Sequence, residues 1–161
     1  MKKIFIYVVV PCTFFIKASS QSTPENLQAI KEQLQKATHD TTRGRLTYEL
    51  AFGYRFSDID SSLYYTDAAI AYAEKLDLPA VKSLMLSLKG ATVLEAGKLP
   101  ESLRYQFEAL EIGEQLKDTT NIAFALNRIG NIYMELGDFK RANEYYFQSK
   151  NLFEKIGDVG M

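Results

Sequence analysis

The sequence repeats itself with a period of 40 residues over most of its length. Several sets of equivalent positions keep their residue type in three successive copies. They are Leu46, Leu86 and Leu126; Ile59, Leu99 and Phe139; Ser62, Ser102 and Ala142; Tyr65, Tyr105 and Tyr145; Ala69, Ala109 and Ser149; Glu74, Glu114 and Glu154; and Leu76, Leu116 and Ile156. A period of roughly 20 to 50 residues is the signature of an array in which each unit buries its apolar face on its neighbour.

Each copy contains two apolar stripes with helical spacing. In the third copy they are Leu126, Ile129, Gly130 and Tyr133, and then Ala142, Tyr146, Ser149, Leu152 and Ile156. Residues three and four apart share one face of a helix. Gly137 and Asp138 lie between the stripes, where glycine suits a helix end and aspartate suits the next helix start. We therefore expect an all-α protein in which each copy is an antiparallel helical hairpin.

The repeat pattern divides the chain into five segments. We expect a signal peptide over 1–20, an N-terminal capping helix within 21–39, and hairpins over 40–78, 79–118 and 119–161. The last segment includes the start of a linker, because 157–161 matches the linker 117–121 that introduces the third copy. The capping helix opens at Thr23, and its narrow stripe of Leu27, Ile30 and Leu34 would shield the first hairpin from water.

The first 20 residues have the three parts of a secretory signal peptide. Lys2 and Lys3 precede an apolar stretch over 4–16, and the small residues 18–20 provide a cleavage site. The apolar stretch is shorter than the roughly 17 to 25 residues that a membrane-spanning helix needs. An uncleaved anchoring segment is the alternative, but the pattern favours export of the mature chain.

Cleavage of this segment is a testable expectation. The exported product should begin near Gln21, because the small residues that the peptidase requires end at Ser20. N-terminal sequencing or the intact mass of exported material measures this. An intact chain beginning at Met1 in the cytoplasm would contradict it.

The charge distribution argues against nucleic acid as a partner. The whole chain has 19 basic and 20 acidic residues, but three lysines and no acid lie before Gln21. The mature chain thus carries a net charge of about −4 and has no cluster of lysine and arginine. Phosphate binding needs such a cluster.

The sequence holds few residues suited to catalysis or metal binding. Cys12 is the only cysteine and lies in the signal peptide, so the mature chain has no thiol. His39 is the only histidine and precedes the first hairpin, where a surface or capping role is expected. Neither a glycine-rich phosphate loop nor a nucleophile elbow is present. We expect no catalytic residue, no cofactor and no metal site.

The third copy resembles a tetratricopeptide repeat. The resemblance rests on Leu126, Ile129, Gly130, Tyr133, Gly137, Asp138, Ala142 and Tyr146, which follow the order of apolar, small, aromatic and turn residues in that family. The second copy keeps Gly90 and Gly97 but has Lys89 and Ser102 at matching places. The first copy fits either this register or one shifted by a residue in its first helix. The resemblance implies a right-handed superhelical array of about three repeats that binds a protein or peptide segment.

Repeats of 40 residues behind a signal peptide are also similar to the extracytoplasmic sensor regions of bacterial membrane histidine kinases and transcription regulators. This resemblance implies the exported sensory part of a longer signalling protein, at the periplasmic or extracytoplasmic face of a bacterial membrane. Membrane contact would then come only from the signal peptide or from a span downstream. The alternative is a structural adaptor or self-association scaffold at the cell envelope.

In the family, the first helices of the hairpins line a concave groove. The candidate groove residues are therefore Leu94, Glu95, Phe124, Asn127, Asn131, Met134 and Glu135, with Leu84, Ser87 and Ala91 beside them. The amides of Asn127 and Asn131 lie one helical turn apart and suit the backbone of an extended peptide, because an amide both donates and accepts. The alternative is that both are solvated surface amides.

The last helix predicts self-association. Its apolar residues include Tyr145, Leu152, Phe153 and Ile156, and terminal units of an array normally have a polar outer face. Those that face outward would lack a covering helix, so we expect this end to associate with a second molecule.

Overall fold

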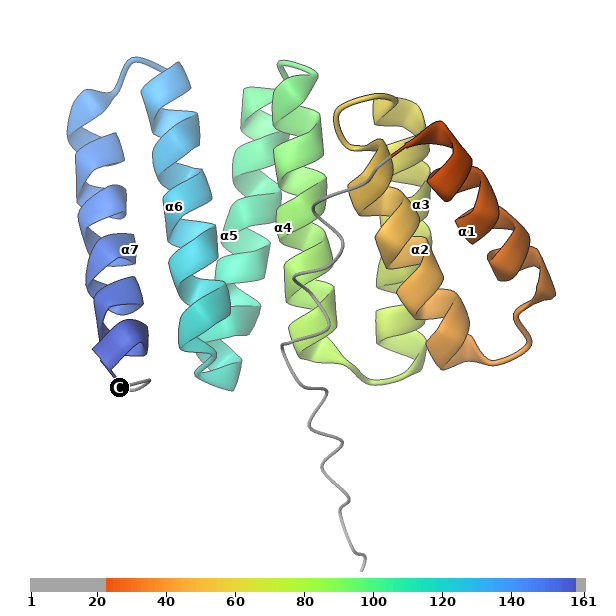
Figure 1. Cartoon of the computed structure of the whole chain (residues 1–161). Helices are drawn as coiled ribbons and strands as arrows, with labels where there is room; N and C mark the ends of the chain where they lie inside the picture. Colours follow the sequence, from red (N-terminus) through yellow and green to blue (C-terminus); the bar gives the residue numbers. More distant parts are fainter. Residues whose placement is uncertain (1–22, 159–161) are drawn as a thin grey trace, which may run out of the picture.

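The computed structural model describes residues 23–158, and these residues form a row of α-helices (Figure 1). The helices are α1 (Pro24–Lys36), α2 (Asp40–Tyr54), α3 (Ile59–Lys75), α4 (Pro79–Glu95), α5 (Leu99–Leu116), α6 (Thr119–Glu135) and α7 (Phe139–Asp158). No strand occurs within 23–158. The expected all-α array is confirmed.

The helices pair into three hairpins, α2 with α3, α4 with α5 and α6 with α7, and α1 lies at the outer edge of the row (Figure 1). Each helix packs against the next one along the chain. In addition, α4 contacts α6 directly, although a whole helix separates them in the sequence. Both are first helices of their hairpins, so this additional contact lies on the side of the row that the first helices form.

The turns inside the second and third hairpins depend on glycine. Gly97 and Gly137 both have a φ of 73°, a left-handed conformation that glycine adopts without steric cost. The next residue, Asp138, donates its backbone N–H to the carbonyl of Tyr133 at 2.9 Å. Its side chain then accepts from the N–H of Arg141 at 3.0 Å and so caps α7. The predicted pairing of a glycine with an aspartate cap is therefore confirmed at this turn.

The 40-residue period of the sequence corresponds to a core that repeats from one hairpin to the next. Leu86 and Leu126 are buried at equivalent places on α4 and α6, as are Ala69, Ala109 and Ser149 on the second helices, and Leu46 of α2 is buried as well. The recurring glutamates 74, 114 and 154 are exposed. Ser149 donates to the carbonyl of Ala123 at 2.7 Å, and Ser83 donates to that of Ala109 at 2.8 Å. Serine thus replaces alanine in the core where its hydroxyl reaches a backbone carbonyl.

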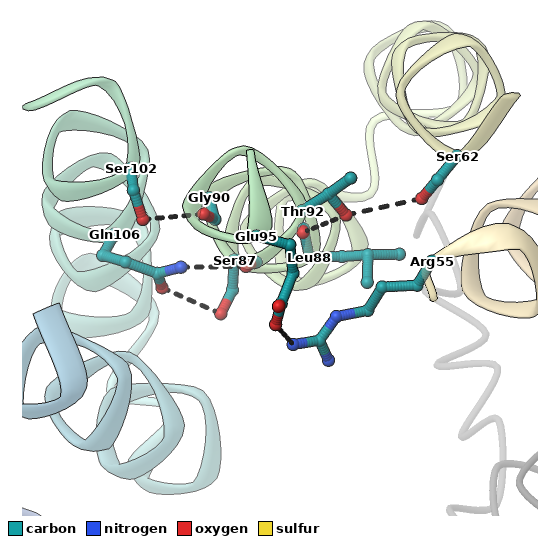
Figure 2. Close-up of polar contacts among 9 residues, drawn as sticks. All are labelled: Arg55, Ser62, Ser87, Leu88, Gly90, Thr92, Glu95, Ser102 and Gln106. Carbon is teal, nitrogen blue, oxygen red and sulfur yellow. Dashed lines mark hydrogen bonds and ion pairs between the residues drawn. The ribbon is translucent and has the colours of Figure 1, made fainter. Parts of the chain in front are cut away.

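Buried polar side chains around Gly90 join the two helices of the second hairpin, α4 and α5 (Figure 2). Ser102 donates its hydroxyl to the carbonyl of Gly90 at 2.7 Å, which explains why serine stands where the third copy has Ala142. Gln106 is fully buried and donates to the carbonyl of Ser87 at 2.9 Å, while Ser87 Oγ donates back to Gln106 Oε1 at 3.0 Å. The side chain of Gln106 fills the space that a Cβ on residue 90 would occupy.

The first hairpin follows the register that is shifted by one residue. Ser62 Oγ donates to the carbonyl of Ala51 at 2.8 Å, as Ser102 does to Gly90. Ala51 precedes its serine by 11 residues and Gly90 precedes its serine by 12. The connection 55–58 between α2 and α3 is one residue longer than 96–98 between α4 and α5. The part of α2 after Ala51 is two residues shorter than the part of α4 after Gly90, and the longer loop offsets one of these, so a small residue stays at the helix crossing.

Lys89 departs from the repeat pattern but is well accommodated. Its ammonium group donates to Asp67 on α3 at 2.6 Å and lies 4.7 Å from the centre of the Tyr105 ring. The ion pair and the cation–π contact thus compensate the partly buried charge.

The helix α1 packs on α2 at the end of the row, in the place expected for a cap. Leu27 is buried, and Thr23 accepts from the N–H of Asn26 at 3.3 Å at the helix start. Arg43 of α2 donates to the carbonyl of Ala37 at 2.9 Å and to the hydroxyl of Tyr72 at 2.6 Å, so it ties the end of α1 to α3. His39 is exposed at the start of α2 and makes no capping hydrogen bond with its side chain.

Two of the four apolar residues of α7 named above pack inward. Tyr145 stacks on Tyr133 with ring centres 5.4 Å apart, and Leu152 lies against the core between α6 and α7. Phe153 and Ile156 stay partly exposed.

The outer face of α7 is also polar at two places that are apolar in α5. Leu103 and Leu110 of α5 pack against the core under α6, whereas the equivalent residues of α7 are the exposed Asn143 and Lys150.

Candidate peptide-binding groove

The candidate groove lies on the first helices, where α4 and α6 pack directly together. Ser87 and Ala91 of α4 and Ala125 of α6 are all buried. Ser87 and Ala91 are therefore unavailable to a ligand, and the expectation that they line the groove is wrong. The surface that remains open is the adjoining face of α6.

The structure places the predicted residues of α6 together on this open face. Phe124, Asn127, Asn131, Met134 and Glu135 are all exposed. Phe124 and Met134 keep 46% and 40% of their surface exposed, which is a large fraction for apolar side chains. On α4, Glu95 is exposed and Leu94 is half-buried.

The two asparagines of this face differ in their partners. Asn131 Oδ1 accepts a hydrogen bond from the hydroxyl of Tyr146 at 2.8 Å. Among the described residues, the side chain of Asn127 has no hydrogen-bond partner. Phe124 likewise has a neighbour, since its ring meets the ring of Phe153 edge-on with centres 5.1 Å apart. Asn127 is therefore the amide most available to an incoming backbone.

This difference predicts unequal effects of two matched substitutions. Asn127→Ala should change the free energy of unfolding by less than about 0.5 kcal/mol, as for a surface change. Asn131→Ala should cost about 0.5 to 1 kcal/mol, because the Tyr146 hydroxyl exchanges a protein partner for water. Urea unfolding measures both. Equal effects would show that the Tyr146 hydrogen bond does not contribute to stability.

A hollow of about 270 Å³ adjoins the open face. It is lined by Leu94, Glu95, Gly97, Leu99 and Glu135. Small-molecule sites usually measure about 300 to 1,000 Å³, so this hollow suits one side chain of a ligand better than a whole cofactor. A second hollow of about 610 Å³ surrounds the turn between α6 and α7 and is lined only by the consecutive residues 136–141.

An arginine that the sequence analysis missed lies beside the groove. Arg55 follows the last residue of α2 and reaches Glu95 of α4, with Nη2 and Oε1 3.6 Å apart (Figure 2). Its Nε is buried and has no hydrogen-bond partner among residues 23–158. The guanidinium carbon lies 4.6 Å from the ring centre of Phe56. Burial lowers the pKa of Arg55, and the nearby Glu95 carboxylate opposes that effect.

Arg128 of α6 is a second arginine that the sequence analysis missed. It is half-buried and forms no ion pair with any residue in 23–158. Burial lowers the pKa of Arg128 to about 10, and the positive charge of Arg55 adds to the effect. Arg128 occupies the place of Leu88 in the second repeat. A charged residue where the second repeat has leucine was the signal that could have revealed it.

The described residues offer little for other chemistry. Within 23–158 no three side chains of histidine, cysteine, aspartate or glutamate come together as a metal site would require. The same range contains no helix that is both long and apolar enough to cross a membrane.

Comparison with known proteins finds a solved structure with a similar fold. No family model and no curated protein matches the sequence. Among solved structures, the chain is similar to the TPR domain of FLU from Arabidopsis, with a TM-score of 0.66 and 20% sequence identity. The similarity covers 73% of this chain and 99% of that domain.

The chain has a tetratricopeptide-like fold. The resemblance of the third copy to this family is therefore confirmed at the level of the fold. Since the identity is low, the likeness shows the fold alone. In the tetratricopeptide-like array described here, α2, α4 and α6 are the first helices of the repeats.

Proposed function

We propose that this chain is a non-enzymatic module that binds an extended segment of another protein along the open face of α6 and the neighbouring end of α4. The observation that carries the proposal is the exposure of Phe124, Asn127 and Met134 on one helix face beside the hollow near Leu94. Apolar contacts of this kind supply affinity, and a free amide supplies hydrogen bonds to a peptide backbone.

The location and wider role belong to the same proposal. The signal peptide pattern over 1–20, which lies outside the described residues, supports export. The 40-residue period supports a sensory region of a longer signalling protein at a bacterial membrane. A coding sequence that continues into a membrane span and a kinase or DNA-binding domain would support this role over that of an adaptor.

A self-association scaffold is the second candidate. It is favoured by Phe139 and Phe147 of α7, which keep 62% and 64% of their surface exposed. The polar Asn143 and Lys150 on the outer face of the same helix weigh against close stacking of a second copy there. Light scattering over a concentration series separates the two candidates, because the scaffold requires a dimer or larger assembly.

Selection from a random peptide library tests the leading proposal. The chain is immobilised, and bound peptides are measured against two variants that each add one arginine. Asn127→Arg places a bulky charge on the open face of α6. Gln148→Arg places the same charge at an exposed residue of α7. We expect the selected peptides to bind the wild type and Gln148→Arg equally and to lose at least tenfold in affinity for Asn127→Arg.

Two outcomes contradict the proposal. Recovery of no peptide would reject peptide binding as the function. Peptides that lose affinity for Gln148→Arg but not for Asn127→Arg would place the binding surface elsewhere. Melting temperatures of both variants ensure that the comparison is made between folded proteins.

A further inference from the structure

We infer that the hollow of about 270 Å³ at the ends of α4 and α6 is a subsite for a basic side chain, lysine or arginine, of the bound segment. This inference rests on the proposed function and specifies the ligand. It is built from the residues that line the hollow, from the position of its two carboxylates at helix ends and from the cations that the chain itself places nearby.

The hollow combines apolar walls with two accessible carboxylates. Its lining residues are Leu94, Glu95, Gly97, Leu99 and Glu135. Leu94 and Leu99 are half-buried and supply apolar surface, whereas Glu95 and Glu135 are exposed. Lysine and arginine side chains have the same two parts, because an aliphatic stem packs on apolar surface and carries a cation at its end. The lining therefore matches a basic side chain better than a purely apolar or an acidic one.

Both carboxylates lie where a negative charge is unfavourable for the helix. Glu95 is the last residue of α4 and Glu135 is the last residue of α6, and the two helices end at the same edge of the row (Figure 1). The C-terminal end of a helix carries partial negative charge and favours a cation, yet neither helix has a basic residue in its last turn. Such departures from the rules of helix stability are typical of functional sites.

The cations of the chain leave a surplus of negative charge at the hollow. Arg55 reaches Glu95 from the side of α2, with 3.6 Å between Nη2 and Oε1 (Figure 2). Glu135 forms no ion pair with any residue in 23–158. Lys98, in the turn after α4, does not line the hollow and pairs with neither glutamate in the described part of the chain. One cation thus faces two carboxylates, and a single basic group of a ligand would neutralise the remaining charge.

The hollow continues the open face of α6. Phe124, Asn127, Asn131 and Glu135 follow one another at intervals of three and four residues, so they share one face of the helix. The exposed Met134 lies directly before Glu135. An extended segment that runs along this face reaches the hollow at the end of α6. We therefore expect the basic residue on the part of the segment that passes Met134.

The first test uses n-butylguanidinium, which has the stem and the charge of an arginine side chain. The methyl signals of Leu94 and Leu99 are followed by NMR, with n-butanol and guanidinium at equal concentrations as probes of the stem alone and the charge alone. We expect n-butylguanidinium to shift both leucine signals saturably and more strongly than either partial probe. In Glu135→Gln this response should fall severalfold. An equal response of Glu135→Gln and wild type would overturn the subsite.

Glu114→Gln is the matched control, because Glu114 is an exposed glutamate in the last turn of α5 and does not line the hollow. Its response to n-butylguanidinium should equal that of wild type. Melting temperatures separate a ligand site from a structural role. We expect Glu135→Gln to melt at or above the temperature of wild type, because the substitution removes a repulsion at the helix end. A lower melting temperature would show that Glu135 has a stabilising partner in the free chain and would overturn the argument from surplus charge.

The second test uses the peptides selected above. In each peptide a basic residue is replaced by a neutral residue of similar length, citrulline for arginine or norleucine for lysine, and the N-terminus is free or acetylated. We expect one such replacement to weaken binding about tenfold in wild type and in Glu114→Gln, and less than about twofold in Glu135→Gln.

Three results of this second test would overturn the inference. They are equal weakening in wild type and Glu135→Gln, dependence of binding on a free N-terminus, and selected peptides without a basic residue. Recovery of no peptide at all would instead reject the proposed function, and the n-butylguanidinium titration would still decide whether the subsite exists.

Discussion

Gly90→Ala is expected to be among the most damaging single methyl additions in this chain. A Cβ at residue 90 would lie 2.4 Å from Nε2 of Gln106, 3.1 Å from its Cδ and 3.2 Å from the backbone oxygen of Ser102. Gln106 is fully buried and must move, so its two hydrogen bonds with Ser87 are lost. Each buried polar group left unsatisfied costs about 1 to 3 kcal/mol.

The opposing term is smaller. Alanine is favoured over glycine inside a helix by about 1 kcal/mol, so the net loss should be about 2 to 4 kcal/mol. This is a large share of the stability of a small domain, which totals roughly 5 to 15 kcal/mol. Urea unfolding followed by circular dichroism measures it.

A double-mutant cycle identifies the cause of that loss. Gln106→Ala removes the atoms that a Cβ at residue 90 would meet, so Gly90→Ala should cost much less in that background. Gly157→Ala is the matched control, because its Cβ would meet nothing within 4 Å. Additive effects of Gly90→Ala and Gln106→Ala would show that the two residues do not share one packing site.

Arg128→Met is expected to stabilise the fold, by about 1 to 3 kcal/mol. Burial lowers the pKa of Arg128 to about 10, well below the ordinary value of a guanidinium, so the folded state holds the proton less tightly than the unfolded chain. Methionine has a similar length and no charge to desolvate. The melting temperature should therefore rise, which is an uncommon result for a single substitution.

The sign of the pH dependence follows from the same shift. The charge on Arg128 costs stability at every pH below about 10, and the cost declines as the pH rises above 10. At neutral pH the full difference between wild type and Arg128→Met should appear. Arg104→Met on the exposed part of α5 is the matched control. A destabilised Arg128→Met would show that Arg128 has a stabilising partner in the folded chain.

The period of the sequence was enough to predict the fold, because packing inside a repeat depends on residues close in the chain. Leu126, Ile129 and Tyr133 are buried as the helical spacing indicated. The glycine turn at Gly137 and the aspartate cap that follows it were equally local signals. Local spacing, however, left the register of α2 open by one residue, and the hydrogen bond from Ser62 to Ala51 decides it.

The candidate site was predicted less completely, since it depends on contacts between repeats. Ser87 and Ala91 have the spacing of groove residues, but α6 packs against α4, and both residues are buried. Asn131 has the spacing of a free amide, yet it accepts a hydrogen bond from Tyr146 of the next helix. The pairing of Arg55 with Glu95 joins two hairpins, and a repeat pattern contains no information on such a contact.

The most direct test of the account is to map where a bound segment touches the chain. A photo-reactive benzoylphenylalanine is placed at residue 127 on the open face of α6 or at residue 148 on α7, and a selected peptide is cross-linked and located by mass spectrometry. The account predicts efficient cross-linking from residue 127 and little from residue 148, both of which are exposed in the free chain. Efficient cross-linking from residue 148 with none from residue 127 would contradict a binding groove on the first helices.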